Sequence, residues 1–278
     1  MKSKPVTDAM AEDMASRISA LKAKGVEPTL AILRVGARPD DLSYERTACK
    51  RAESLGITIR IMEMPEDVTQ EAMLEAVGQI NADATIHGCL MFRPLPKHLN
   101  EQEICDALAV EKDVDGISAA SMAGIYSGAE CFAPCTAEAC IKMLDHYGVD
   151  LVGKRVVVAG RSLVIGKPVA MLLMARNATV TVCHSKTVDL AGTMAAAEVV
   201  ICATGMAKAY GPECFSAGQT VVDVGINFAD GKLCGDVDFE AVEPVVEGIT
   251  PVPGGIGSVT TSTTMEHVVT AAERAASL

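Results

Sequence analysis

The chain has 278 residues, a formal net charge of −12, 49% hydrophobic residues and no tryptophan. This length allows one large domain or two ordinary domains, each with its own core. The acidic balance argues against nucleic acid as a partner, because phosphate binding requires a basic surface. No apolar stretch approaches the roughly 18 residues of a membrane span, and the polar start lacks the apolar core of a secretory signal. We therefore expect a cytoplasmic globular protein with neither a nucleic-acid nor a membrane partner.

The ten cysteines predict neither a metal site nor a disulfide framework. Cys131 and Cys135 are four residues apart, the others are scattered, and no histidine joins them at the spacing of a zinc-binding motif. Cytosolic proteins keep such thiols reduced. We expect reduced core and surface thiols and no bound metal.

Helical and strand-like patterns alternate through the first half of the chain. Residues 6–24 carry apolar side chains at helical spacing and end at Gly25, and residues 29–35 form a strand-like run closed by Gly36. The same rhythm predicts strands at 57–62 and 89–92, and helices at 42–55, 69–82 and 136–147. Strands that alternate with helices are typical of a parallel sheet with helical crossovers.

The second half begins with the most strand-like segment, residues 155–159. Further strands are expected at 178–183, 199–203 and 220–224, and helices at 166–176, 189–197 and 258–276. No low-complexity linker separates the halves, so the domain boundary is expected to fall within continuous structure. The pattern predicts an α/β protein with parallel sheets.

The loop after strand 155–159 has the features of a dinucleotide-binding turn. Gly160 permits a tight turn, and Gly166 lets backbone amides at the helix start approach phosphate oxygens. Pro168 suits the first helical turn, where no N–H is needed. The loop departs from the usual GxGxxG pattern because Ser162 replaces the second glycine and the spacing is longer. An ordinary strand-to-helix turn is the alternative interpretation.

Residues after the next strands strengthen the dinucleotide hypothesis. No acidic residue stands where NAD sites bind the ribose hydroxyls, and Arg161, Ser185 and Lys186 are suited to a 2′-phosphate. This favours NADP and leaves NAD open. His184, which on its own is typical of a structural histidine, is assigned a cofactor contact only. The candidate cofactor-binding residues are Gly160, Arg161, Ser162, Ile165, Gly166, Pro168, His184, Ser185, Thr204, Gly205, Gly225 and Ile226.

Several segments, in order and across nearly the whole chain, resemble the methylenetetrahydrofolate dehydrogenase/cyclohydrolase family. In the first half they are Val35-Gly36 with Ser43-Tyr44, Pro94-Leu95-Pro96, Lys112-Asp113-Val114-Asp115-Gly116 and Pro134-Cys135-Thr136. In the second half they are residues 160–168, His184-Ser185, Asp223-Val224-Gly225-Ile226-Asn227, Gly235-Asp236-Val237 and residues 250–257.

The resemblance implies an N-terminal α/β folate-site domain at 1–140, with the helix at 258–278 packing back on it, and a Rossmann-type NAD(P)-binding domain at 141–257. It also implies a folate cleft between them and a homodimer formed through the cofactor domains. Tyr44 matches the tyrosine that packs on the folate ring, and Asp115 the aspartate that hydrogen-bonds the pterin. Pro253, Gly254 and Gly255 are expected to shape the substrate site. A core aromatic, a turn aspartate and a rigid turn are the plain alternatives.

The sequence departs from the family at two positions of the cyclohydrolase step. Ala48 stands where the family has the essential lysine, and Phe92 where it has the glutamine that polarises this lysine. A helix turns about 100° per residue, so position 48 lies about 40° from Tyr44, whereas Lys50 lies about 200° beyond Ala48 and is expected to point away.

These departures predict an NADP-dependent dehydrogenase that oxidises 5,10-methylenetetrahydrofolate and has weak or no cyclohydrolase activity. Hydride transfer releases no proton, whereas hydrolysis depends on acid–base catalysis worth about 10²–10⁴-fold. Two alternatives remain: an enzyme with both activities that uses another acid–base group, such as Lys50 or a water held by Asp115, and a non-catalytic protein that binds folate and dinucleotide.

Overall fold

A computed structural model describes residues 1–229 and 231–277, which form two compact α/β units. The N-terminal unit comprises Ala9–Cys135 and Thr261–Leu278, and the C-terminal unit comprises Met1–Asp8 and Thr136–Thr260. Both sheets that carry the units are parallel, which confirms the predicted two-domain α/β class. No helix in the described part of the chain has the length and apolarity to cross a membrane.

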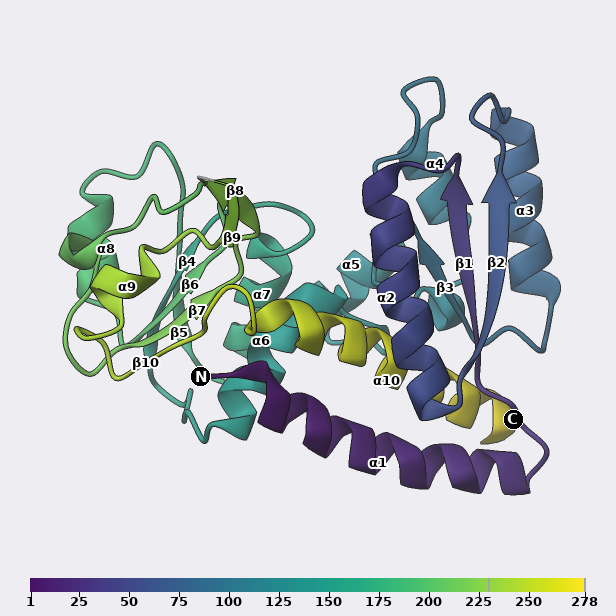
Figure 1. Cartoon of the computed structure of the whole chain (residues 1–278), viewed down its shortest axis with the longest axis horizontal. Helices are drawn as coiled ribbons and strands as arrows, with labels where there is room; N and C mark the ends of the chain where they lie inside the picture. Colours follow the sequence, from purple (N-terminus) through teal and green to yellow (C-terminus); the bar gives the residue numbers. More distant parts are fainter. Residues whose placement is uncertain (230, 278) are drawn as a thin grey trace. The chain divides into compact units, whose positions relative to one another are not determined.

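A three-stranded parallel sheet forms the centre of the N-terminal unit, in the order β2-β1-β3. Its strands are β1 (Thr29–Val35), β2 (Thr58–Met64) and β3 (Gly88–Met91). Helices α2 and α3 lie on opposite sides of it (Figure 1). The unit's helices are α2 (Pro39–Leu55), α3 (Gln70–Ala82), α4 (Glu101–Asp106) and α5 (Ala119–Ser127), with most of α1 (Ser3–Ala23) and α10 (Ile256–Ser277).

Strand β1 is buried along its whole length because both faces of the sheet are covered. Leu30 and Ile32 pack in one apolar cluster with residues of α1, α2 and α10, and Ala31 and Leu33 pack in a second cluster with residues of α3 and α4. Side chains alternate between the faces of a strand, so burial on both faces requires a continuous apolar run. The sequence shows such a run at residues 30–33.

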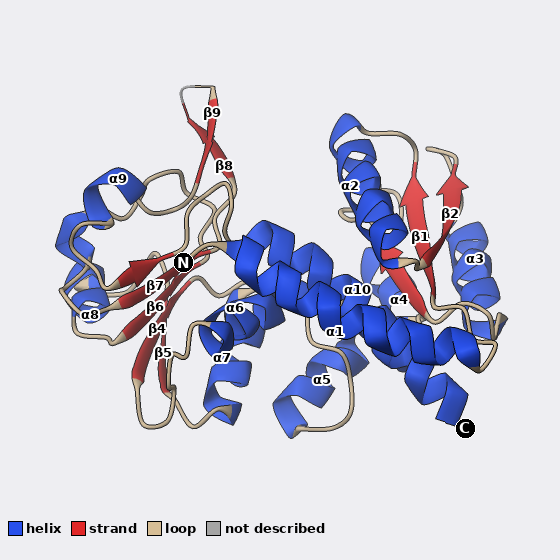
Figure 2. Ribbon diagram, turned by 60° about the horizontal axis from the view of Figure 1, so that its bottom comes forward, coloured by secondary structure: helices blue, strands red, loops and turns tan. Residues whose placement is uncertain are grey.

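A five-stranded parallel sheet forms the centre of the C-terminal unit, in the order β10-β7-β6-β4-β5. Its strands are β4 (Arg155–Ala159), β5 (Thr179–Cys183), β6 (Val199–Cys202), β7 (Thr220–Asp223) and β10 (Gly248–Ile249). Helices α6 (Cys135–His146) and α7 (Gly166–Ala175) lie on one side, and α8 (Leu190–Ala195) and α9 (Phe239–Val242) on the other (Figure 2). The chain reverses its direction across the sheet at β4, the point where such sheets bind ligands.

Short elements were not predicted from the sequence pattern. Besides α4, α5, α9 and β10, they are the antiparallel pair β8 (Asn227–Ala229) and β9 (Lys232–Cys234) and the 3-10 turns η1 (Val110–Lys112) and η2 (Pro212–Cys214). The longer predicted elements are present, with ends that differ by at most three residues from the expected ones.

Candidate cofactor and substrate sites

The loop that follows β4 is held in a conformation that only glycine fits. Gly160 has a φ of +129°, and a Cβ atom built on it would lie 2.2 Å from the carbonyl oxygen of Ala203. A Cβ on Gly166 would lie 2.3 Å from the carbonyl oxygen of Gly160. The two predicted glycines are therefore adjacent in space and close the loop. Ser162 Oγ accepts the N–H groups of Ile165 and Gly166 at the start of α7.

Arg161 and Ser185 occupy equivalent places at the ends of neighbouring strands. Ala159 of β4 pairs with Cys183 of β5, so each of the two residues lies two positions beyond a paired residue. Both side chains are exposed. His184 shapes the turn, since its Nδ1 accepts the N–H of Lys186. The predicted 2′-phosphate residues thus lie on one edge of the sheet, beside the glycine loop.

A pocket of about 270 Å³ brings together residues that the sequence assigned to cofactor and to substrate. Gly225 and Ile226, which follow β7, line it together with Pro253, Gly254 and Gly255 from the turn before α10. Gly255 is also tightly placed, because a Cβ on it would lie 2.4 Å from the carbonyl oxygen of Pro251. The two predicted groups therefore share one cavity of the C-terminal unit.

Two buried aspartates organise the loops around these residues, and they were missing from the predicted set of site residues. Asp236 is fully buried and accepts hydrogen bonds from the backbone N–H groups of Thr204, Gly205 and Met206. Asp223 accepts the N–H groups of Gly225, Asp236 and Val237. The motifs that contain them were noted, but sequence alone does not show that a carboxylate points inward at backbone donors.

Asp223 has a raised affinity for its proton. Burial is the main cause that raises its pKa from 3.8 to about 6; the three N–H donors oppose the shift and the charge of Asp236 adds to it. A carboxyl with a raised pKa binds its proton more tightly in the folded state. Its contribution to stability is complete below pH 3.8 and is lost as the pH rises through 6.

The variant Asp223→Asn tests this linkage. The quantity to follow is the free energy of unfolding of the natural protein minus that of the variant. This difference is expected to fall by at most about 3 kcal/mol between pH 4 and pH 7, because the pKa rises from 3.8 to about 6 and each pKa unit corresponds to about 1.4 kcal/mol. Urea unfolding at several pH values measures the difference, and subtraction removes the titration of the other carboxyls. A difference that does not change with pH would contradict the prediction.

In the N-terminal unit, the predicted folate residues lie near one another. Tyr44 on α2 is 39% exposed, yet burial around its hydroxyl and then the charge of Asp115 raise its pKa, while a hydrogen bond with Thr261 opposes the shift. Burial also raises the pKa of Asp115, opposed by hydrogen bonds from Cys135 and by the charge of Arg93. The half-exposed Tyr44 ring thus lies near the Asp115 carboxyl, which accepts hydrogen bonds from the N–H and S–H groups of Cys135.

The loop that carries Asp115 is anchored by its neighbour Asp113. Asp113 is fully buried and accepts the N–H groups of Ile117 and Ser118 and the hydroxyls of Ser118 and Ser121. Gly116 follows with a φ of +59°, and a Cβ on it would lie 2.6 Å from the carbonyl oxygen of Phe132. The DVDG segment is therefore a fixed turn with Asp115 at its centre.

Ala48 and Phe92 are part of the apolar core beside Tyr44. Ala48 is 1% exposed and Phe92 is 5% exposed, and both belong to the cluster that contains Leu30 and Ile32. The Phe92 ring lies against Tyr44, with 5.5 Å between centroids and planes at 58°. Lys50, by contrast, is exposed.

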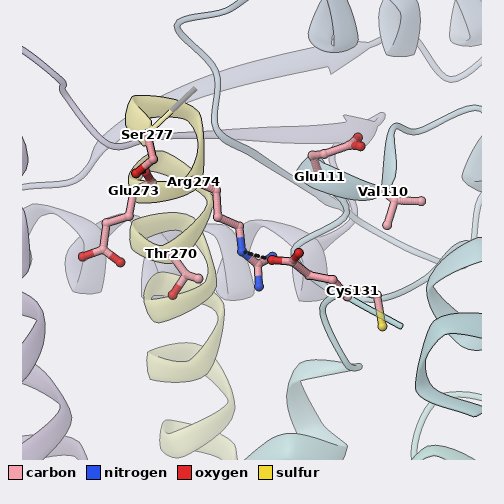
Figure 3. A pocket seen from close by; sticks show the side chains of 8 residues that line it. Val110, Glu111, Cys131, Thr270, Glu273, Arg274 and Ser277 are labelled. Carbon is pink, nitrogen blue, oxygen red and sulfur yellow. Dashed lines mark hydrogen bonds and ion pairs between the residues drawn. The ribbon is translucent and has the colours of Figure 1, made fainter. Parts of the chain in front are cut away.

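A separate pocket, with a volume of about 540 Å³, lies in the N-terminal unit (Figure 3). Arg274 and Glu130, which both line it, form an ion pair of 2.9 Å between Nε and Oε1. The Arg274 guanidinium also lies 4.6 Å from the centroid of the Phe132 ring. The residues that line it are Val110, Glu111, Glu130, Cys131, Thr270, Glu273, Arg274 and Ser277. None of the predicted site residues is among them, so this pocket is distinct from the candidate site.

Family models match both halves of the chain. Residues 1–115 match the catalytic domain of the tetrahydrofolate dehydrogenase/cyclohydrolase family, and residues 134–276 match its NAD(P)-binding domain. A relative from Carboxydothermus hydrogenoformans, the bifunctional protein FolD, is 49% identical over 274 residues, which cover 97% of this chain and 96% of the relative.

Two solved structures share the fold over nearly their whole length. The FolD methylenetetrahydrofolate dehydrogenase/cyclohydrolase of Campylobacter jejuni has a TM-score of 0.96 and 36% identity, with 98% of each chain covered. The Trypanosoma brucei enzyme, complexed with NADP cofactor and inhibitor, has a TM-score of 0.92 and 33% identity, with 99% of this chain and 97% of that chain covered. The resemblance drawn from the sequence motifs is confirmed: this chain belongs to the tetrahydrofolate dehydrogenase/cyclohydrolase family.

Proposed function

We propose that this protein oxidises 5,10-methylenetetrahydrofolate to 5,10-methenyltetrahydrofolate with NADP, and that its cyclohydrolase activity is weak or absent. Family membership supports the first half of the proposal. One observation carries the second half: the positions of the cyclohydrolase lysine and glutamine are occupied by Ala48 and Phe92, both buried in an apolar cluster against Tyr44.

The loop after β4 fits a dinucleotide. Gly160 and Gly166 let the loop close tightly against the backbone of Ala203 and Gly160, next to the N-terminus of α7, whose dipole favours a pyrophosphate. A bound dinucleotide supplies the nicotinamide carbon that takes up a hydride. No proton leaves in that oxidation, so the chain contributes alignment and a fixed electrostatic surface rather than a general base.

The preference for NADP rests on charge at the β5 edge of the sheet. Arg161 and Ser185 lie beyond the paired ends of β4 and β5, and Lys186 follows directly. A guanidinium and an ammonium group suit the two negative charges of a 2′-phosphate, whereas a ribose hydroxyl pair calls for a carboxylate acceptor. The relative from Trypanosoma brucei, which is 33% identical, was solved with NADP.

Tyr44 and Asp115 are the residues we assign to the folate. The half-exposed Tyr44 ring offers an aromatic surface for the folate ring system, and the Asp115 carboxyl offers an acceptor for the amino group and ring N–H of a pterin. The turn anchored by Asp113 fixes that carboxyl in place, which limits the conformational cost of binding.

Hydrolysis of the methenyl cation makes different demands. Water must attack, lose a proton and transfer one to the departing ring nitrogen, and a positioned acid or base contributes about 10²–10⁴-fold to such steps. Methyl and phenyl side chains do neither. A second candidate function retains hydrolysis through Asp115, whose raised pKa suits proton transfer better than that of an ordinary carboxyl. Lys50 is a weaker candidate because it is exposed on the other side of α2.

Two spectrophotometric assays on one preparation separate these functions. We expect the protein to oxidise methylenetetrahydrofolate with NADP, and to do so more slowly with the same concentration of NAD. We expect added methenyltetrahydrofolate to decay at the rate of the buffer control. Methenyl decay that scales with protein concentration, and that Asp115→Asn abolishes at saturating substrate, would establish the second candidate. Dinucleotide and folate binding without turnover would instead leave a non-catalytic binding protein.

A further inference from the structure

Asp236 gathers donors from two loops that are far apart in sequence. Its carboxylate accepts five hydrogen bonds: the N–H groups of Thr204, Gly205 and Met206, the Thr204 hydroxyl and the Asn227 amide, at 2.5 to 3.0 Å. The first loop follows β6 and the second follows β7. A buried carboxylate that is fully satisfied by N–H and O–H donors fixes both loops at once, since hydrogen bonds to a charged acceptor are roughly twice as strong as neutral ones.

Asp236 and Asp223 also lock the loops together sterically. A Cβ on Gly225 would lie 2.2 Å from Asp236 Oδ1, and a Cβ on Gly235 would lie 1.8 Å from Asp223 Oδ2. The Asp236 carboxylate therefore fills the space beside Gly225, two residues after Asp223. The Asp223 carboxylate likewise fills the space beside Gly235, which directly precedes Asp236. The backbone N–H of Asp236 in turn donates to Asp223. The loops after β6 and β7 consequently behave as one rigid surface at the carboxyl ends of these strands.

We propose that Asp236 is a positioning residue for the nicotinamide half of the dinucleotide, an inference that rests on the proposed dehydrogenase function. Strand β4, which carries the glycine loop, lies between β5 on one side and β6 and β7 on the other. Arg161 and Ser185 assign the 2′-phosphate, and hence the adenosine half, to the β5 side. The other half then lies over the loops that Asp236 holds.

Asp236 acts through these loops and not by contact. Its carboxylate is fully buried and saturated by donors from the protein itself, so it offers nothing to a ligand. Its effect is to aim the backbone of residues 204–206, and its carboxylate lies against Gly225, which lines the 270 Å³ pocket together with Gly254. Loss of its charge is expected to loosen the backbone of residues 204–206 and to leave Arg161 and Ser185, beyond β4 and β5, in place.

The substitution Asp236→Asn keeps the shape of the side chain but turns an amide N–H against existing donors. The dissociation constant of NADP is expected to rise about 10- to 100-fold, as for loss of charged hydrogen bonds. Adenosine 2′,5′-bisphosphate, which lacks the nicotinamide half, is expected to bind with less than about a twofold change. Isothermal titration measures both constants. A purely structural defect would weaken the two ligands alike, and either that result or an unchanged NADP constant would overturn the proposal.

A matched control and a rescue complete the test. Asp238→Asn removes a nearby charge whose side chain makes no capping hydrogen bond, and it is expected to leave both constants unchanged. Adding Asn227→Asp to Asp236→Asn restores the pair of side chains with reversed roles and is expected to recover part of the NADP affinity. Absence of any recovery would count against the proposal.

Two further results keep the outcome clear. If Asp236→Asn does not fold, Asn227→Asp alone places a second carboxylate against Asp236, and the same split between NADP and the fragment is expected. Equal weakening of the two ligands in that variant would overturn the proposal. If the natural protein binds neither ligand, the proposed dinucleotide function fails, which is a different result from equal weakening by the variant.

Discussion

Replacing Ala48 by lysine together with Phe92 by glutamine is expected to create methenyl hydrolysis in a protein that otherwise lacks it. Position 48 is one helical turn from Tyr44, so a lysine there projects from the same face of α2. Burial lowers the pKa of a lysine and brings it toward neutrality, where acid–base catalysis is efficient. Hydrolysis about 10²–10⁴-fold above the parent protein is the expected scale, read from the loss of methenyl absorbance.

Each of the two changes alone is expected to fail, for different reasons. Lysine at position 48 beside Phe92 places an ammonium group in an apolar cluster without a partner, which is strongly destabilising. Glutamine at position 92 alone removes the ring packed on Tyr44 and supplies no base. In the double variant the glutamine amide oxygen accepts from the lysine, so each change compensates the other.

Thr47→Lys is the matched control for the double variant. Thr47 is exposed on α2, and the turn of about 100° per residue directs its side chain away from the cluster that contains Ala48. It adds the same charge one residue away and is expected to leave hydrolysis at the buffer rate. Retained dehydrogenase activity reports that the double variant is folded. A folded, dehydrogenase-active double variant with no hydrolysis would contradict the assigned roles of positions 48 and 92.

The sequence was sufficient for the fold class because the largest elements carry strong patterns. The continuous apolar segments of β1, residues 30–33, and of β4, residues 156–159, predict strands covered on both faces, and α2 and α7 end near the predicted residues. The short elements were missed because their stability is tertiary. Helix α4 has six residues, and its start depends on Asn100 accepting the N–H of Glu103. No periodic pattern is detectable over so short a segment.

The candidate site could be predicted only in part, for a similar reason. Gly160, Gly166 and Tyr44 lie in recognisable local contexts, so sequence singled them out. Asp236 acts on Thr204, which lies 32 residues earlier in the chain, and nothing in its own neighbourhood indicates that its carboxylate is turned inward. Contacts between distant loops are set by the packing of the sheet, which a single sequence does not contain.

Gly160→Ala is expected to abolish measurable NADP binding. The φ of +129° at this position is one that side-chain-bearing residues rarely adopt, and the new Cβ would lie 2.2 Å from the backbone oxygen of Ala203. Backbone cannot yield as a flexible side chain does: the N–H of Gly160 bonds to Cys183 in β5, and the N–H of Ala203 bonds to Ala159 in β4. Strain and overpacking together are expected to cost about 2–5 kcal/mol of stability.

The loss of NADP binding energy is expected to exceed the loss of stability. The loop can relieve the collision by moving, but it is the same loop that we assign to the dinucleotide. Gly78→Ala is the matched control: Gly78 lies inside α3, nothing approaches within 4 Å of its new Cβ, and the change is expected to raise stability by about 0.5–1 kcal/mol. Titration with NADP and thermal unfolding of both variants provide the two measurements. Gly160→Ala with an unchanged NADP constant would show that the loop after β4 does not hold the dinucleotide, since no L-residue fits that backbone without displacing it.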